Sequence, residues 1–538
     1  MGVRHACISP GARNSSLTYA FTKKSKITCY SHVDERSSAF FGLGLAKSTQ
    51  KPVVLISTSG TAPANFYPAV IEASLSRVPL IILSADRPNY LVGTGANQTI
   101  DQQNLYGIHV RYFADVGLPN KKLDVLQEKL EEAFHNAVGF DYEIPPGPVH
   151  LNFPFDEPLI PESVAEKNIP SLTLTGQSDQ EFNIEIQKLT EATRPLIIAG
   201  PMEGNTHREE IIEFAAKINA PILADPISQL RYGFNSELIL SHYDIFLRYA
   251  DIQPDLVLRF GRKPISKVLC QLLNNWANNT ILVDAWQQYN DDCTNFIQFP
   301  ILNYCREQVE IIDWQGGTDW VNKLLSLENI VEIEIQKEII FHEGTIARVC
   351  FESLGDGGQF FAGNSMPVRD VDMFTSTSHK RVNIYSNRGA SGIDGVISTA
   401  LGMCAESGNS FSLLLVGDLS FYHDMNGLLA SRDGMNLTIV VINNSGGGIF
   451  SFLPIADAGI DKFEQFWTTD TGLNIEKSAE LYNCRYYSAQ NISELTNCIQ
   501  ESIKKDGVKI IEVKMVISEN IIAHRNFLEK VKLLFSNN

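Results

Sequence analysis

Short, almost wholly apolar runs alternate with helix-like stretches along this chain, and the alternation limits the folds open to it. Near the C-terminal end, FSLLLVGD and LTIVVINN enclose SFYHDMNGLLASRD, which is long enough for a crossover helix. Such apolar runs are typical of strands buried on both faces, as in parallel sheets covered by helices. This part of the chain is therefore predicted to be a strand–helix–strand unit with parallel strands.

The same alternation occurs in three series. The first contains the predicted strands Arg4–Ser9, Lys26–Ser31, Pro52–Thr58, Pro79–Ala85 and Pro148–Phe153, with a helical pattern from Leu123 to Phe134. The second contains RPLIIAGP, APILADP, PDLVLRFG and NTILVDA, and the third GQFFAGN, VNIYSN, FSLLLVGD, LTIVVINN and KIIEVKM. We predict an α/β protein in which the first and third series could share a topology.

A chain of 538 residues exceeds the roughly 250 to 300 residues that one hydrophobic core usually serves. We therefore expect three doubly wound domains with mostly parallel sheets, at residues 1–160, 181–320 and 340–538. The segment Pro154–Gln180 is rich in Pro, Ser and Thr and is predicted to be a linker.

The composition and charge of the chain exclude several classes of protein and of binding partner. Apolar residues make up 44% of the chain, yet no apolar stretch reaches the length of a membrane helix, and no signal-peptide pattern begins the chain. The nine cysteines are scattered without CxxC spacing, which argues against zinc sites and disulfide frameworks and favours a cytoplasmic protein. A net charge of -18 disfavours nucleic acid, so an anionic substrate would need local arginines.

Polar residues end two neighbouring strands of the third series. Asp418 follows FSLLLVG and Asn444 follows LTIVVIN, so both are expected at carboxyl ends of parallel strands, where open α/β sheets bind ligands. Their oxygens, with the flexible backbone around Gly446, suit Mg²⁺ or Mn²⁺ shared with a diphosphate. The alternative is that Asp418 only caps the next helix and that NNSGGG is only a turn.

The spacing of these motifs resembles that of the thiamine-diphosphate-dependent enzymes, whose metal motif is GDG followed some 25 to 30 residues later by NN; here GDLS stands in the first place. The resemblance implies thiamine diphosphate as cofactor, with Asp418, Asn444 and Gly446 as metal ligands and Leu419 and Ser420 beside the cofactor. In SHVDERSSAFFGLGLAKS it places Glu35 next to the aminopyrimidine ring as the catalytic acid. The alternative for Glu35 is plain helix-start chemistry, with Asp34 as the cap.

Longer blocks are similar to one family within this group, the 2-succinyl-5-enolpyruvyl-6-hydroxy-3-cyclohexene-1-carboxylate synthases of menaquinone biosynthesis. They include SPGARNSSLT, TSGTAPANFYPAVIEA, GANQTIDQ, FAGNSMPVRD and YSNRGASGIDG. The resemblance implies a transferase that decarboxylates 2-oxoglutarate and adds the resulting succinyl carbanion to isochorismate, releasing CO2.

Site residues follow from the same blocks. The resemblance implies that the substrates contact Arg13, Arg87, Asn97, Gln98, Lys267, Ser365, Arg369 and Arg388. It also implies that Ile393 supports the bent cofactor and that Phe450 forms a wall over it. The alternatives are solvated surface charges for the arginines, an exposed helix face for Lys267, and ordinary core packing for Ile393 and Phe450.

The resemblance further implies a homodimer or homotetramer, with active sites between chains and a structural middle domain. Two other functions stay open on the residues alone. One is a different thiamine-diphosphate decarboxylase or carboligase, although the chain has no GxGxxG motif of the kind that would support a dinucleotide such as FAD. The other is a catalytically degenerate scaffold, suggested by Ala12 in a position where the family usually has serine.

Overall fold

The computed structural model describes residues 2–23, 26–119, 123–160, 189–202, 208–287, 290–408 and 410–536. The chain divides into two compact units. The first comprises Met1–Glu181, Asn387–Gly408 and His423–Met435, and the second comprises Phe182–Ser386, Asn409–Tyr422 and Asn436–Asn538. The linker predicted for Pro154–Gln180 lies outside the described residues from position 161 onward.

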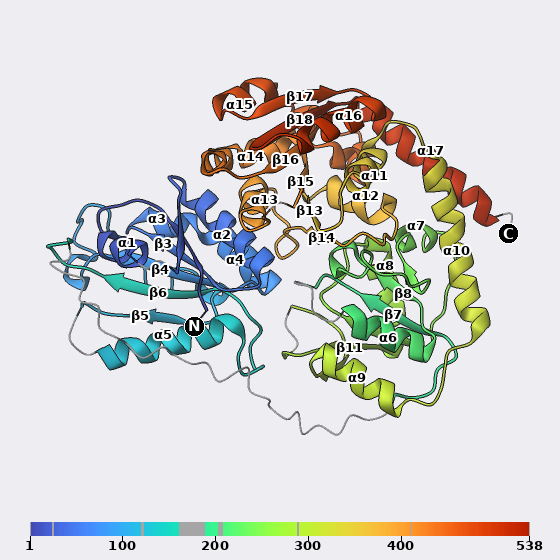
Figure 1. The fold of residues 1–538 in the computed structure, drawn as a ribbon, viewed down its shortest axis with the longest axis horizontal. Coiled ribbons are helices and arrows are strands. Elements are labelled where there is room, and N and C mark those ends of the chain that lie inside the picture. Colours follow the sequence, from blue (N-terminus) through green and yellow to red (C-terminus); the bar gives the residue numbers. More distant parts are fainter. Residues whose placement is uncertain are drawn as a thin grey trace. The chain divides into compact units, whose positions relative to one another are not determined.

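The first unit contains a six-stranded sheet in the order β2-β1-β3-β4-β6-β5, in which all neighbours are parallel (Figure 1, blue to cyan). The strands are β1 (His5–Ile8), β2 (Thr28–Ser31), β3 (Val53–Ser57), β4 (Leu80–Asp86), β5 (Phe113–Asp115) and β6 (Val149–Pro154). The helices are α1 (Ser15–Thr22), α2 (Glu35–Thr49), α3 (Thr61–Asn65), α4 (Tyr67–Ser76), α5 (Leu123–Val138) and α13 (Val396–Cys404), with 3-10 turns at Asn89–Leu91, Gly107–His109 and Met425–Asp433.

The second unit contains two parallel six-stranded sheets (Figure 1, green and orange to red). The middle sheet has the order β12-β11-β10-β7-β8-β9. Its strands are β7 (Pro195–Ala199), β8 (Ile222–Ala224), β9 (Ile239–Leu240), β10 (Leu256–Phe260), β11 (Thr280–Asp284) and β12 (Asn295–Gln298). Around it lie α6 (Arg208–Ile218), α7 (Tyr243–Phe246), α8 (Lys267–Asn275), α9 (Ile301–Ile311) and α10 (Thr318–Lys337), with 3-10 turns at Pro226–Ser228 and Ala277–Asn279.

The third sheet has the order β14-β13-β15-β16-β18-β17. Its strands are β13 (Gly358–Ala362), β14 (Val382–Tyr385), β15 (Ser412–Gly417), β16 (Leu437–Asn443), β17 (Arg485–Ala489) and β18 (Val508–Lys514). Its helices are α11 (Glu343–Glu352), α12 (Met366–Phe374), α14 (Asp418–His423), α15 (Ile475–Leu481), α16 (Ile492–Ile503) and α17 (Ile517–Ser536); shorter turns occupy Gly448–Phe452, Pro454–Asp457 and Glu464–Thr468.

The three sheets confirm the predicted fold class, and the first and third share one topology. When the strands of each sheet are numbered from one, both read 2-1-3-4-6-5, whereas the middle sheet reads 3-2-1-4-5-6 from β9. In such open sheets the direction of winding reverses at one point, and ligands bind beyond the carboxyl ends of the strands there. These points lie between β1 and β3 in the first sheet and between β13 and β15 in the third.

Four strands were missed from the sequence, and all four are sheet edges: β5, β9, β12 and β17. Three of them are partly exposed and mix polar with apolar residues, and β9 has only two residues. The predicted crossover SFYHDMNGLLASRD also needs correction, because it is α14 followed by a 3-10 helix rather than one helix. The break falls at Asp424, whose buried carboxylate accepts hydrogen bonds from the backbone and hydroxyl of Ser398.

Within the first unit, α2 packs against α13 with almost no space between their backbones. A Cβ atom at Gly44 would lie 1.9 Å from the carbonyl oxygen of Thr399, and one at Gly402 would lie 2.0 Å from that of Phe41. Glycine is therefore required at both positions for this approach. The glycine-containing stretch after Glu35 thus has a packing role, in addition to any role of Glu35 itself.

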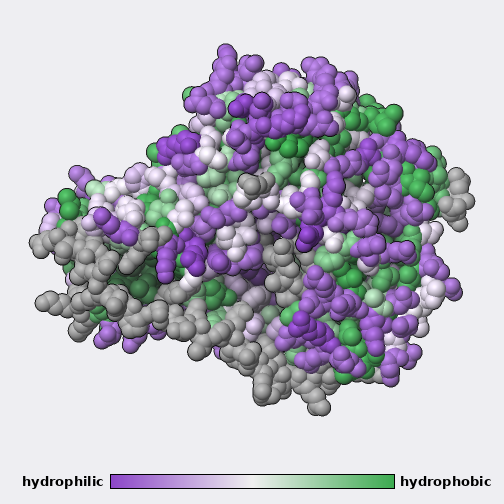
Figure 2. Space-filling model, in the orientation of Figure 1, coloured by the Kyte–Doolittle hydropathy of each residue, from purple (hydrophilic) through white to green (hydrophobic). Residues whose placement is uncertain are grey.

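Hydrophilic residues predominate on the visible surface around α15 and α16, at the top of Figure 2, as the high negative charge of the chain leads one to expect. Among the described residues, every helix is too short or too polar to cross a membrane.

Candidate functional site

The tips of β15 and β16 bring Asp418 and Gly446 together. One carboxylate oxygen of Asp418 accepts a hydrogen bond from the backbone N–H of Leu419, and the other accepts one from Gly446, each at 2.8 Å. Burial raises the pKa of Asp418 to about 6, although both hydrogen bonds favour its ionised form. Asp418 does begin α14, as the capping alternative supposed, but its second oxygen reaches across to the neighbouring strand tip.

Asn444 lies in the same loop and keeps an oxygen available. Its amide nitrogen donates to Glu343 Oε1 at 2.8 Å, whereas its Oδ1 is buried and has no hydrogen-bond partner among the described residues. A buried polar atom without a partner is costly unless an absent ligand satisfies it. A hard oxygen of this kind, beside the Asp418 carboxylate, fits a divalent cation such as Mg²⁺.

The glycines of this loop allow a close backbone approach. Gly446 has a φ of +131°, and a Cβ atom there would lie 2.1 Å from the carbonyl oxygen of Thr468. The next residue, Gly447, donates its N–H to the same oxygen at 2.5 Å. Any side chain at 446 would therefore displace the segment around Thr468 and the position of the Gly446 backbone.

Ser365 and Arg369 lie at the other side of the switch point, after β13. Ser365 precedes α12 with a φ of 73°, and Arg369, one turn into the helix, donates to the Ser365 carbonyl. The structure thus brings these two candidates together beyond the carboxyl end of β13. On α14, Ser420 is buried and the neighbouring Leu419 is half-buried. Phe450 is also half-buried and lies in the 3-10 turn that follows the loop of Asn444 and Gly446.

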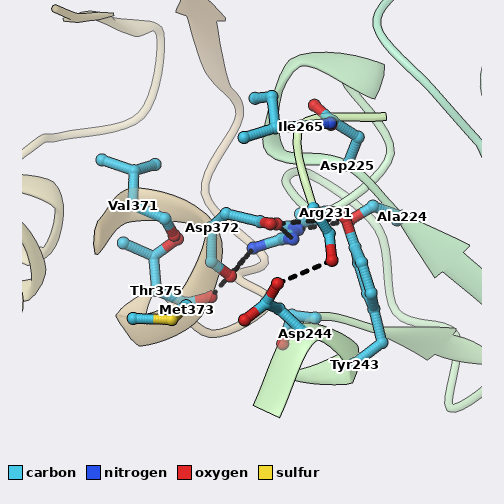
Figure 3. Close-up of polar contacts among 12 residues, drawn as sticks. Ala224, Asp225, Arg231, Tyr243, Asp244, Ile265, Val371, Asp372, Met373 and Thr375 are labelled. Atoms are coloured by element: carbon cyan, nitrogen blue, oxygen red, sulfur yellow. Dashed lines mark hydrogen bonds and ion pairs between the residues drawn. The ribbon is translucent and has the colours of Figure 1, made fainter. Parts of the chain in front are cut away.

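A buried ion pair fixes α12 against the layer of the middle sheet (Figure 3). Arg231 is fully buried, and its guanidinium donates to both the carboxylate and the carbonyl oxygen of Asp372. The hydroxyl of Tyr243 donates to the same carboxylate at 3.1 Å. These hydrogen bonds join Asp372 of α12 to Arg231 and Tyr243 at several atoms. They therefore hold α12, the helix that carries Arg369, in one position against the middle sheet.

In the first unit, Arg13, Arg87 and Gln98 gather around the carboxyl ends of β1, β3 and β4. Ser59 connects two of them, since its hydroxyl accepts from Arg87 Nη1 at 2.8 Å and donates to the Gln98 carbonyl at 3.0 Å. Burial, and next the positive charge of Arg13, lower the pKa of Arg87. Two guanidinium groups in such a position are chemically suited to an anion, and Arg13 also lies 3.8 Å from a carboxylate oxygen of Glu157.

The remaining substrate candidates are less closely tied to these sites. Asn97 is exposed beside Gln98. Lys267 is exposed on the first turn of α8, and within the described residues no hydrogen bond or ion pair joins it to another candidate. This position matches the exposed helix face weighed as its alternative.

Glu35 begins α2 and is half-buried. Asp34 is the helix cap, with its carboxylate accepting from the N–H groups of Arg36 and Ser37 at 2.9 and 3.3 Å. Asp34 is thus the cap, as the helix-start alternative also supposed, and the catalytic role of Glu35 stays a prediction. Burial raises the pKa of Glu35 above its usual value.

The loop that carries Arg388 and Ile393 is anchored by Glu72 of α4. The Glu72 side chain, 3% exposed, accepts from three successive backbone N–H groups: Gly389 at 2.8 Å, and Ala390 and Ser391 at 2.7 and 3.3 Å. Successive N–H groups of this kind form an anion-binding nest. Ile393 is 38% exposed, so in the described chain it is not a core residue.

Among the residues that contact the candidates or their loops, Ser59, Glu72 and Glu343 were not singled out from the sequence. Ser59 directly follows a predicted strand, so its position at a strand tip was a usable signal. Glu72 and Glu343 had no such signal, because each lies in a helix and meets its partner only through the tertiary fold.

Three family models match successive parts of the chain. Residues 1–105 match "Thiamine pyrophosphate enzyme, N-terminal TPP binding domain", residues 172–362 match "Middle domain of thiamine pyrophosphate", and residues 373–513 match "Thiamine pyrophosphate enzyme, C-terminal TPP binding domain". The first match includes Glu35, and the third includes Asp418 and Asn444.

Similar curated proteins narrow the family. The 2-succinyl-5-enolpyruvyl-6-hydroxy-3-cyclohexene-1-carboxylate synthase of Listeria innocua is 40% identical to this chain, over 98% of the chain and 95% of the relative. The chain belongs to this synthase family. The synthase of Geobacillus kaustophilus is 38% identical, over 97% of the chain and 94% of the relative. Membership in the synthase family confirms the predicted resemblance and makes the protein a thiamine diphosphate enzyme.

The solved structures agree on the fold. Benzoylformate decarboxylase from Polynucleobacter necessarius superposes with a TM-score of 0.70 over 96% of both chains, at 16% sequence identity. At this identity the likeness shows the fold alone. It carries no information on which substrate this synthase-family chain uses.

Proposed function

We propose that this protein decarboxylates 2-oxoglutarate and joins the remaining succinyl unit to isochorismate, giving 2-succinyl-5-enolpyruvyl-6-hydroxy-3-cyclohexene-1-carboxylate and CO2 for menaquinone biosynthesis. The observation that carries the proposal is the pairing of family membership with intact donors: Asp418, Asn444 and Glu35 are all present and placed at element ends. The Asn444 oxygen, buried without a hydrogen-bond partner in the described part of the chain, supports a ligand-binding site over a degenerate scaffold, because such an atom is costly unless a ligand satisfies it.

The metal is part of the proposal. Asp418, Asn444 Oδ1 and the Gly446 carbonyl would hold Mg²⁺ or Mn²⁺, and the ion would bind the diphosphate of the cofactor. When bound, thiamine diphosphate supplies the carbon that accepts the 2-oxo acid and stabilises the charge left by decarboxylation. The chain would supply the rest: Leu419 and Ser420 beside the diphosphate, Ile393 under the cofactor, Phe450 excluding water, and Glu35 holding a proton at the aminopyrimidine.

Substrate binding would rest on fixed cations. Both proposed substrates carry two carboxylates, and the guanidinium fork binds a carboxylate through two parallel hydrogen bonds. We propose that Arg13 and Arg87 serve one carboxylate, since Ser59 and burial hold Arg87 in place. Arg369 with Ser365, Arg388 on its anchored loop, and Asn97 and Gln98 would complete the substrate contacts. Lys267 stays a proposed substrate contact, although it lies on the exposed first turn of α8.

The reaction can be tested directly with the purified protein. We expect incubation with isochorismate, 2-oxoglutarate, Mg²⁺ and thiamine diphosphate to give a product with the mass of the succinyl adduct. Omitting any one component should abolish it, and pyruvate in place of 2-oxoglutarate should give little adduct. Release of CO2 from 2-oxoglutarate without an adduct would instead point to a simple decarboxylase.

We also propose a cytoplasmic homodimer or homotetramer whose active sites lie between chains, with Glu35 and the metal ligands of one site supplied by different subunits. Tagged heterodimers of Glu35→Gln and Asp418→Ala chains test this, because each contains one intact site and one doubly altered site. We expect such heterodimers to show about half the wild-type rate per dimer, while either homodimer is nearly inactive. If one chain supplied both residues, the heterodimer would be inactive too.

A further inference from the structure

The side-chain amide of Asn444 is held in one orientation by a buried carboxylate. Glu343 is the first residue of α11, is 2% exposed, and accepts a hydrogen bond from Asn444 Nδ2 at 2.8 Å. The residues are 101 positions apart in the sequence. A Cβ atom at Gly448 would lie 2.6 Å from Asn444 Nδ2, so the absence of a side chain at Gly448 leaves room for the amide.

An amide has a donor end and an acceptor end that differ little in shape, so its orientation depends on its neighbours. Here the NH2 end of the amide faces Glu343, because Nδ2 donates to its Oε1. The other end, Asn444 Oδ1, is then directed away from Glu343, and it is the atom that is buried without a partner among the residues that the structure describes. We infer that Glu343 is a positioning residue that orients the Asn444 amide so that its oxygen faces the metal site.

Glu343 is itself held firmly enough to act in this way. Its backbone N–H donates to Asn520 Oδ1 of α17 at 2.9 Å. The preceding residue, His342, caps α11 through a hydrogen bond from the N–H of Gly344 to its ring, at 3.0 Å. The start of α11 is thus tied to the C-terminal helix, and the carboxylate is presented to Asn444 from a rigid element.

The inference rests on the metal site of the proposed function, so the test measures metal binding directly. The affinity for Mn²⁺ in the presence of thiamine diphosphate is followed by the electron paramagnetic resonance signal of the free ion. Glu343→Asp keeps the charge but shortens the reach to Asn444, whereas Glu343→Gln keeps the reach and an acceptor oxygen but loses the charge. We expect Glu343→Asp to weaken Mn²⁺ binding about 10- to 100-fold, and Glu343→Gln to retain most of the affinity.

The matched control is Glu512→Asp, which shortens another buried carboxylate, one that accepts a hydrogen bond from Nδ2 of the neighbouring Asn443 at 2.6 Å. It should change thermal unfolding more than Mn²⁺ affinity. Wild-type affinity in Glu343→Asp, or equal losses in both Glu343 variants, would overturn the inference. If Glu343→Asp does not fold, Glu343→Met replaces it with the same expectation.

Failure of the proposed function would give a different result in the Mn²⁺ binding experiment. If the wild-type protein binds no Mn²⁺, or if Asp418→Ala binds it as well as wild type, the metal site itself is wrong. If those two proteins behave as proposed and the Glu343 variants match wild type, only the positioning role is wrong.

Discussion

Replacing Glu35 by glutamine is expected to reduce turnover by about 10²- to 10⁴-fold, the usual contribution of a positioned acid or base. Glutamine preserves the size of the side chain but cannot donate and regain a proton at neutral pH. The effect should fall on kcat, with thiamine diphosphate affinity nearly unchanged, because Glu35 lies on α2 whereas the metal donors lie at the tips of β15 and β16. Rates of adduct formation and calorimetry of the cofactor check the two parts.

The neighbouring carboxylate offers a matched control. Asp34→Asn removes a charge next to Glu35 but keeps an oxygen that can cap α2, since asparagine caps helices as well as aspartate does. It should lose far less turnover than Glu35→Gln. Normal turnover in Glu35→Gln would show that Glu35 only favours the start of the helix, as its alternative holds.

Replacing Asp418 by alanine is expected to weaken metal-dependent binding of thiamine diphosphate by more than the roughly 10- to 100-fold that loss of an outer partner costs. The substitution removes the only carboxylate among the three proposed metal donors, and it also leaves the N–H of Gly446 without its acceptor. Titration of the cofactor with and without Mg²⁺ measures the effect.

Asp470→Ala is the control for charge alone. Asp470 is exposed and close enough that its negative charge helps to raise the pKa of Asp418, after burial as the main cause. Its removal should leave metal-dependent affinity near wild type. Unchanged affinity in Asp418→Ala would mean that Asp418 serves only its helix and the neighbouring loop.

The central strands were predictable because their burial is encoded locally. β3 and β4 are buried along their whole length, and β15 along all but its last residue, so each is a nearly continuous apolar run. The edges β12 and β17 face solvent in part, which replaces that run by mixed sequences such as NFIQ and RYYSA. An apolar run identifies a strand only where the whole strand is buried, and partly exposed edge strands lack such a run.

The same distinction applies to the site. Asp418 and Asn444 were identified because parallel strands place their carboxyl ends at one edge, which follows from strand order and direction alone. The sequence named Asp34 as the helix cap, and its hydrogen bonds to Arg36 and Ser37 agree. Whether Glu35 is catalytic or only favours the helix start stays a prediction, because both roles fit its position at the start of α2.

The sequence by itself determined the family, the three parallel sheets and the residues at their strand tips, because apolar patterning and long motifs are properties of contiguous segments. Only the tertiary structure decided which groups support those residues. The bond from Gly389 to Glu72 spans 317 positions, and that from Asn444 to Glu343 spans 101. No local pattern records such pairs, since each depends on how separately formed helices and loops pack.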